Sequence, residues 1–165
     1  MPESGLARPL RILVVDDSPS DVRLIREALK ESPGNATLLI ARDGVEATDY
    51  LQKALLGEYP RPDLIVLDLN LPRKSGREVL AEIKANPRLK QIPVIVMTSS
   101  SASEDVANAY NLNANSYITK PADLADYLKV VRAFHVFWLH AAKLPDEDFA
   151  APPIPEPAIR STVLQ

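Results

Sequence analysis

The sequence contains no cysteine, which excludes disulfide bonds, thiol catalysis and thiolate metal sites. Neither sign of charge strongly predominates, because 19 basic and 22 acidic residues leave a net charge of -3. This balance gives no electrostatic reason to expect nucleic acid or an anionic membrane as a partner. The N-terminal residues lack the apolar core of a signal peptide, and no uncharged apolar run approaches the roughly 18 residues of a membrane span. We therefore expect a cytoplasmic protein.

Short β-rich apolar runs alternate with amphipathic helical segments along the 165 residues. The runs predict strands at residues 10–15, 37–41, 64–67, 92–97 and 116–119, each followed by a helix. This alternation is typical of a parallel sheet with helices on both faces. We expect a flavodoxin-like α/β fold of five strands in the order 2-1-3-4-5, with one full hydrophobic core.

Helix N-termini are indicated by residues that favour caps. Ser18 precedes a proline at the first helical position after the first strand. Ser75 with Glu78, and Ser101 with Glu104, have the spacing of capping boxes for the third and fourth helices.

Residues able to do chemistry follow four of the five strands: Asp16 and Asp17, Asp68, Thr98 and Lys120. The C-termini of parallel strands lie on one edge of a sheet, so these side chains should converge. Any one of the strand-end acids or hydroxyls could be only a helix cap, but five polar residues at one edge indicate a site. Three clustered carboxylates favour a bound cation, and Mg²⁺ accepts carboxylates while leaving room for phosphate oxygens. Asp68 could then attack phosphorus and form an aspartyl phosphate, with Lys120 and Thr98 holding the phosphoryl oxygens.

With these motifs, residues 8–142 resemble the receiver domain of bacterial two-component response regulators. The resemblance implies that Asp16 and Asp17 bind the metal, Asp68 is the phosphoacceptor, and Thr98 and Lys120 contact the phosphoryl group. In the family, the residue at the Asn70 position offers its backbone carbonyl to the metal.

The same resemblance implies a switch in which Thr98 moves toward the phosphoryl group and Tyr117 turns inward. It also implies a cis peptide bond between Lys120 and Pro121. The Asn70 and Ser100 side chains would border the path of attacking water and tune the phosphoryl lifetime.

Residues 68–84 and 137–139 look like those of stand-alone response regulators that serve phytochrome histidine kinases. This resemblance implies a kinase phosphohistidine as donor, with a light-sensing kinase as the leading candidate. It implies a signalling domain that catalyses only its own phosphorylation and slow dephosphorylation. With no output domain expected after the fifth helix, output would be a contact of the receiver itself or the removal of phosphoryl groups from a kinase.

The fifth helix, predicted at about 123–142, carries two apolar stripes. One stripe suffices to cover a sheet, so the second predicts a homodimer through the fourth helix, fifth strand and fifth helix, unless both stripes are core. The stripes are Leu124, Leu128, Val131 and Trp138, and Tyr127, Val130, Phe134 and Phe137. His135 and His140 are five apart, which is not the spacing of a helical metal pair, and we expect them at the surface or an interface.

Residues 143–165 are rich in proline and are expected to form a disordered extension or an arm that docks on a partner. Two other functions fit the sequence less well. An Asp-nucleophile phosphohydrolase would place its acids as Asp-x-Asp and carry an insertion that selects substrate, whereas here Asp16 and Asp17 are adjacent. An unphosphorylated pseudo-receiver acting as a dimeric scaffold would not need the full set of site residues.

Overall fold

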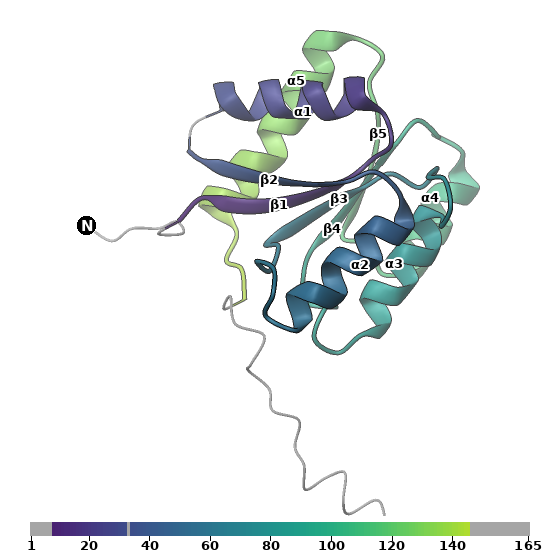
Figure 1. The fold of residues 1–165 in the computed structure, drawn as a ribbon. Coiled ribbons are helices and arrows are strands. Elements are labelled where there is room, and N and C mark those ends of the chain that lie inside the picture. The colour runs from purple at the N-terminus through teal and green to yellow at the C-terminus, as the bar shows by residue number, and fades with distance from the viewer. Residues whose placement is uncertain (1–7, 33, 146–165) are drawn as a thin grey trace, which may run out of the picture.

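The structure is a computed structural model that describes residues 8–32 and 34–145. Its five strands are parallel and form one sheet in the order β2-β1-β3-β4-β5, so the predicted fold is confirmed (Figure 1). The elements are β1 Leu10–Val15, α1 Pro19–Glu31, β2 Ala36–Ala41, α2 Gly44–Leu55, β3 Leu64–Leu67, α3 Gly76–Ala85, β4 Val94–Thr98, α4 Ser103–Asn111, β5 Ser116–Thr119, α5 Leu124–Val136 and the π-helical turn η1 Phe137–Ala141.

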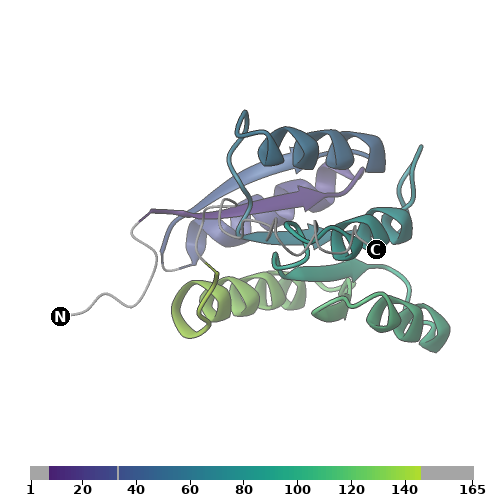
Figure 2. The ribbon, with the colours of Figure 1, turned by 90° about the horizontal axis from the view of Figure 1, so that it is seen from below.

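Helices cover both faces of the sheet. Helices α1 and α5 lie together on one face, and α2, α3 and α4 lie on the other (Figures 1 and 2). Successive strand residues point to opposite faces, so Leu13 and Val15 pack toward α2 and α3 while Ile12 and Val14 pack toward α1 and α5. All four residues of β3 are buried. The central strands β1 and β3 are thereby fixed between two apolar layers, and so are the residues that follow them.

The predicted N-termini of α1 and α3 are confirmed. The Ser18 side chain accepts a hydrogen bond from a backbone N–H of α1. At α3, Ser75 and Glu78 form both hydrogen bonds of a capping box. The capping box predicted at Ser101 is wrong, because the N-cap of α4 is Ala102 and makes no side-chain hydrogen bond.

Several predicted element ends also shift. Strand β4 begins at Val94 instead of residue 92, since Pro93 has no N–H to donate to a sheet ladder. Helix α5 ends at Val136, and η1 follows it, closed by a hydrogen bond from the Ala142 N–H to the Phe137 carbonyl. The described residues contain no cis peptide bond, so the expectation for the bond before Pro121 is wrong.

Neither predicted stripe of α5 matches the face that the fold buries. The buried side combines residues of both stripes with two that belong to neither; it consists of Tyr127, Val131, Phe134, His135 and, in η1, Leu139. Each stripe also includes a largely exposed residue: Leu124 of the first stripe is 56% exposed, and Phe137 of the second is 51% exposed. Periodicity shows which residues share a face of a helix, but the neighbours of the helix decide which face is buried. The angle at which α1 packs against α5 does not follow from periodicity alone.

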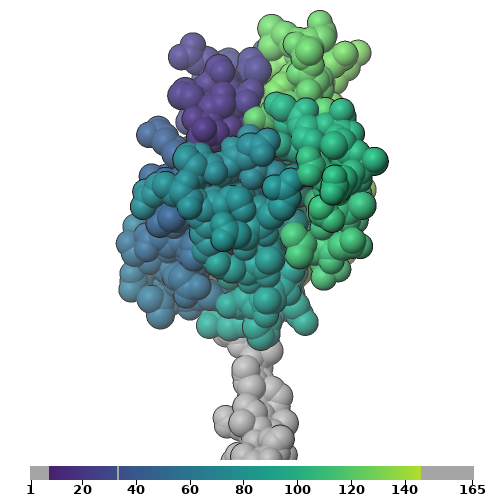
Figure 3. Space-filling view, turned by 90° about the vertical axis from the view of Figure 1, so that its right-hand side faces the viewer, coloured from purple at the N-terminus to yellow at the C-terminus, as the bar shows by residue number. Residues whose placement is uncertain are grey.

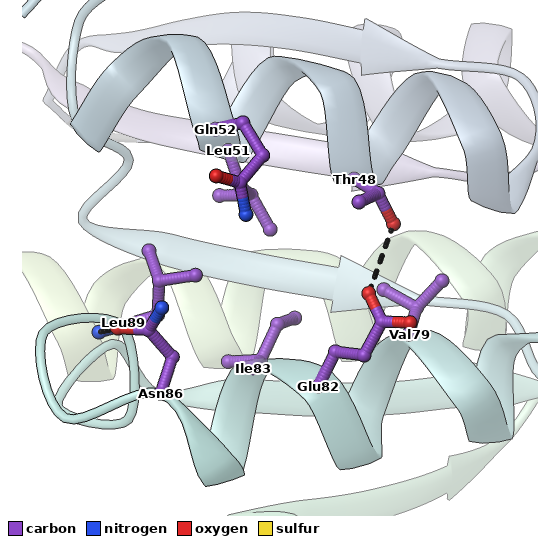
Figure 4. Close-up of a pocket in the computed structure, with 8 residues that line it drawn as sticks. All are labelled: Thr48, Leu51, Gln52, Val79, Glu82, Ile83, Asn86 and Leu89. Atoms are coloured by element: carbon purple, nitrogen blue, oxygen red, sulfur yellow. Dashed lines mark hydrogen bonds between the residues drawn. The ribbon is translucent and has the colours of Figure 1, made fainter. Parts of the chain in front are cut away.

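A shallow hollow lies between α2 and α3, away from the predicted phosphoacceptor (Figure 4). Leu51, Val79 and Ile83 give it an apolar lining, and the hydroxyl of Thr48 donates to the carboxylate of Glu82 at its edge, over 3.4 Å. The hollow brings no cluster of acids or bases together, and we regard it as a packing feature of the two helices.

The last described residues also pack on the fold. Leu144 contacts the apolar layer between the sheet and helices α1 and α5. The greater part of the predicted proline-rich extension, residues 146–165, lies outside the described residues.

Candidate functional site

The acids predicted to converge do so at the edge where the strands end. Asp16 and Asp17 follow β1, Asp68 follows β3, and β1 pairs directly with β3. Each of the three carboxylates offers an oxygen, and these three oxygens lie within 4.8 Å of one another. Figure 3 shows this side of the molecule, where segments from the beginning, middle and later part of the chain meet. Three carboxylates at this spacing suit a hard divalent cation with water and phosphate as its other ligands.

Asp68 is held by three donors from three parts of the chain. Its Oδ1 accepts hydrogen bonds from the Thr98 hydroxyl (2.8 Å) and the Asn70 N–H (3.1 Å), and its Oδ2 accepts from Lys120 Nζ (2.9 Å). Asp68 and Thr98 are both buried. These bonds orient the carboxylate, and the donors Thr98 and Lys120 are well placed for oxygens of a group attached to it. The sequence predicted Thr98 and Lys120 here, but did not predict the hydrogen bond from the Asn70 N–H.

Lys120 contacts three carboxylates, and the contact with Asp21 is one that the sequence did not predict. Its Nζ lies 2.9 Å from Asp16 Oδ2, 2.9 Å from Asp68 Oδ2 and 2.7 Å from Asp21 Oδ2. Burial lowers the pKa of Lys120, but hydrogen bonds to the three acids, with Asp21 first among them, outweigh burial and raise it. The sequence predicted no site role for Asp21. Its place one helical turn after the strand-end pair was the available signal.

The adjacent acids Asp16 and Asp17 lie in different surroundings. Asp16 is 4% exposed, whereas Asp17 is exposed to solvent. Burial raises the pKa of Asp16, and the charge of Asp68 adds to it, against hydrogen bonds from Lys120 and the Ser18 N–H. Negative charge is therefore crowded at this edge, which is the condition that favours a bound cation.

The loop after β4 is tied to neighbouring elements by polar contacts. The Tyr117 hydroxyl donates to the Ser100 carbonyl oxygen over 2.8 Å. The Ser100 hydroxyl donates to Asp105 Oδ2 (2.6 Å), and Arg77 donates to Asp105 Oδ1 (2.6 Å). Both contacts lower the pKa of Asp105, that from Ser100 most. The Ser100 side chain thus binds α4 in this structure. Asn70, the other residue predicted to border the path of attacking water, is exposed.

The two histidines have unlike positions, and the prediction for His135 is wrong. His135 is fully buried, with Nδ1 2.8 Å from the Ser32 hydroxyl oxygen, while His140 is exposed. Burial lowers the pKa of His135. The residue continues the buried face four positions after Val131, and this spacing was the signal for its location.

Comparisons with known proteins match both the sequence and the fold. Residues 12–132 match the model of the response regulator receiver domain family. The chain is 51% identical over 140 residues to the response regulator Rcp1 of Synechocystis sp. (strain ATCC 27184 / PCC 6803 / Kazusa), covering 83% of this chain and 94% of Rcp1.

Two solved structures extend this match. The Mn²⁺-bound form of response regulator Rcp1 is 50% identical with a TM-score of 0.78, and the phosphorylated cyanobacterial phytochrome response regulator RcpA is 46% identical with a TM-score of 0.80. Each match covers 84% of this chain and 100% of the other. In the described residues, no helix is long and apolar enough to cross a membrane.

Proposed function

Because this chain belongs to the response regulator receiver domain family and is a response regulator of the Rcp1 type, we propose that it is a Mg²⁺-dependent switch phosphorylated on Asp68. The observation that carries the proposal is the Asp68 carboxylate itself. It is buried beside two further acids and already contacts the hydroxyl and ammonium groups that phosphoryl oxygens require.

In the reaction, an oxygen of Asp68 forms a bond to phosphorus while the bond from phosphorus to a kinase histidine breaks. The imidazole leaves with the electron pair of that bond. The Lys120 ammonium and the Thr98 hydroxyl, both hydrogen-bonded to Asp68, then donate hydrogen bonds to phosphoryl oxygens. The products are the aspartyl phosphate and the free kinase histidine.

The residues present fit a divalent cation, since carboxylates are its preferred protein ligands. Asp16, Asp17 and Asp68 would hold it through the oxygens that lie within 4.8 Å of one another, and the Asn70 backbone carbonyl would complete the protein ligands. Bound there, Mg²⁺ would offset the negative charge of the transferring phosphoryl group. Rcp1 is described in a Mn²⁺-bound form, which supports a divalent ion as a ligand of this chain.

Phosphorylation would change the loop after β4. Thr98 gives up its bond to Asp68 for one to the phosphoryl group, and Tyr117 leaves the Ser100 carbonyl and turns into the space that Thr98 vacates. A few kcal/mol of differential stabilisation is sufficient for such a shift. The face built from α4, β5 and α5 would then differ between the two states.

We infer that the phosphoryl donor is a sensor histidine kinase in the cytoplasm, with a bacteriophytochrome as the leading candidate. RcpA is described as a phytochrome response regulator, and RtBRR, 32% identical over 94% of this chain with a TM-score of 0.65, as a bacteriophytochrome response regulator. The α4–β5–α5 face would form a homodimer. Exposed apolar side chains there, Tyr110 on α4 and Leu124 on α5, support this surface.

Intact mass after incubation with acetyl phosphate, with and without Mg²⁺, tests the proposed chemistry. We expect one phosphoryl adduct that requires Mg²⁺ and is absent from Asp68→Asn, because the amide is not a nucleophile. Asp126→Asn, at an exposed acid outside the site, serves as the control and should incorporate phosphate like the wild type.

An adduct that persists in Asp68→Asn would place the acceptor elsewhere. Absence of any adduct would favour a pseudo-receiver, and continued turnover of a small phosphate ester would favour a phosphohydrolase. Circular dichroism of each variant shows whether the fold is retained.

A further inference from the structure

The third carboxylate on Lys120 is not part of the acid group that suits a cation. Asp16 and Asp68 belong to that group, whereas Asp21 approaches from the first turn of α1 and makes the shortest of the three contacts, at 2.7 Å. Lys120 and Asp21 are 99 positions apart in the sequence. Asp21 is thus the one acid on this ammonium that a cation held by the acid group would leave free.

Two cations need carboxylates of the same two residues in this site. The Lys120 ammonium occupies Asp16 Oδ2 and Asp68 Oδ2, and a divalent ion among the acids draws on carboxylates of the same two residues. An ammonium beside a divalent ion also repels it, and the repulsion is strong where water is largely excluded. Without another acceptor, Lys120 would compete with the metal for Asp16 and Asp68.

Asp21 is well fixed for the role of that acceptor. Its backbone N–H donates to the N-cap hydroxyl of Ser18 over 3.2 Å, which orders the turn that carries it. Tyr127 of α5 is 3% exposed, and the pKa of its hydroxyl is raised by burial and next by the charge of Asp21. The Lys120 side chain is only 9% exposed and that of Asp21 22%, so limited access of water strengthens the pair.

We propose that Asp21 is a positioning residue that retains Lys120 on the α1 side of the site, so that the ammonium and a divalent cation occupy it together. The inference rests on the proposed function, since it concerns the same metal and the same lysine. Asp21 lowers the competition between the two cations for Asp16 and Asp68, and keeps Lys120 within reach of a phosphoryl oxygen on Asp68.

The test is a double-mutant cycle on Mg²⁺ affinity, measured by isothermal titration calorimetry on the full chain. Asp21→Asn keeps the shape of the side chain and removes its charge; Lys120→Met removes the competing cation. We expect Asp21→Asn to weaken Mg²⁺ binding about fivefold or more in the wild-type background, within the range of coupling between contacting residues. In the Lys120→Met background, the same change should weaken binding less than about twofold, because only a screened charge is lost.

Asp126→Asn is the matched control. Asp126 occupies the same position in α5 as Asp21 in α1, three residues after a capping side chain that accepts from its N–H, and it makes no described contact with Lys120. It should leave Mg²⁺ affinity unchanged, and thermal denaturation identifies any variant that is not folded.

An equal loss of affinity in both backgrounds would mean that Asp21 acts by its charge alone, and would overturn the proposal. So would an unchanged affinity in Asp21→Asn while the wild type binds Mg²⁺; this result would leave the proposed function standing. A wild type that binds no Mg²⁺ would overturn both.

Discussion

At the scale of single residues, burial separates ionisable groups that the sequence places side by side. Asp16 and Asp17 are neighbours in sequence, yet one is buried in contact with Lys120 and the other faces solvent. The buried acid has its pKa raised by loss of hydration, and it contributes negative charge where water cannot screen it. The exposed acid is open to hydrated ions, so the pair combines access with a strong local field.

His135 provides a residue-scale prediction about pH. Burial lowers its pKa below that of the unfolded chain, where histidine titrates near 6.5. The unfolded state then binds more protons than the folded state as pH falls below about 6.5, so the free energy of unfolding should decrease. One such group changes the free energy of unfolding by at most about 1.4 kcal/mol per pH unit. This dependence on pH ends once the pH is below the pKa of the folded state, because both states then bind the proton.

Urea unfolding of wild type and His135→Gln between neutral and mildly acidic pH checks this. The wild type should lose stability in that window, and the variant should lose less, whatever its stability at neutral pH. Ser101→Ala, at an exposed residue that carries no titrating group, is the control and should retain the wild-type slope. Equal slopes in wild type and His135→Gln would contradict the expectation.

At the scale of elements, α4 is held much less firmly than α3. Helix α3 has a capping box and four buried residues, while α4 has one buried residue, Ala109, and no side-chain cap. Its N-terminal region is linked to the site loop mainly through Ser100 and Asp105. Regions with few buried contacts open most easily, so α4 is the element best suited to move when the loop after β4 changes.

Supplying the missing cap should stabilise the protein. In Ala102→Ser, the new hydroxyl can accept from the free N–H groups of the first turn, and a serine in place of alanine at an N-cap contributes about 0.5–2 kcal/mol. Thermal denaturation should show a higher melting temperature. Ser101→Ala is the matched control, since Ser101 lies outside the cap, and should leave stability unchanged; a clear loss in this variant would restore Ser101 as a capping residue.

At the scale of the whole molecule, exposed apolar side chains are separated into different regions. Leu56, 72% exposed, ends α2, whereas Leu124 and Tyr110 belong to α5 and α4, the helices of the proposed dimer surface. Large apolar groups that gather on one face commonly mark an interface. Leu124 and Tyr110 are therefore assigned to the proposed dimer surface by their position on α5 and α4, and not by their degree of exposure.

If the proposed homodimer forms through this face, Leu124→Asp should convert it to a monomer. The substitution places a charge in the interface, yet an acid in the first turn of α5 is compatible with the helix dipole, so the fold should be retained. Light scattering coupled to size exclusion measures the mass in solution. Leu56→Asp adds the same charge at the end of α2 and should remain dimeric; a dimer that survives Leu124→Asp would place the contact elsewhere.

The sequence by itself determined the order of strands and helices and the chemistry collected at one edge. Short apolar runs such as residues 64–67 indicate buried parallel strands, and parallel strands end on a common edge, so Asp68, Thr98 and Lys120 had to converge there. Local signals also placed the capping box at Ser75, because its two hydrogen bonds connect residues only three apart.

Only the tertiary structure decided the contacts that depend on how elements are rotated and packed. The hydrogen bond between Asp21 and Lys120 requires α1 to meet the end of β5. His135 is buried where α5 packs against α1, and it contacts the α1 C-cap Ser32. Ala102 is the N-cap of α4, and next to it the Ser100 hydroxyl accepts from the Ala102 N–H and donates to Asp105. Periodicity defines the faces of a helix, whereas the neighbours that cover a face follow from the packing of the whole chain.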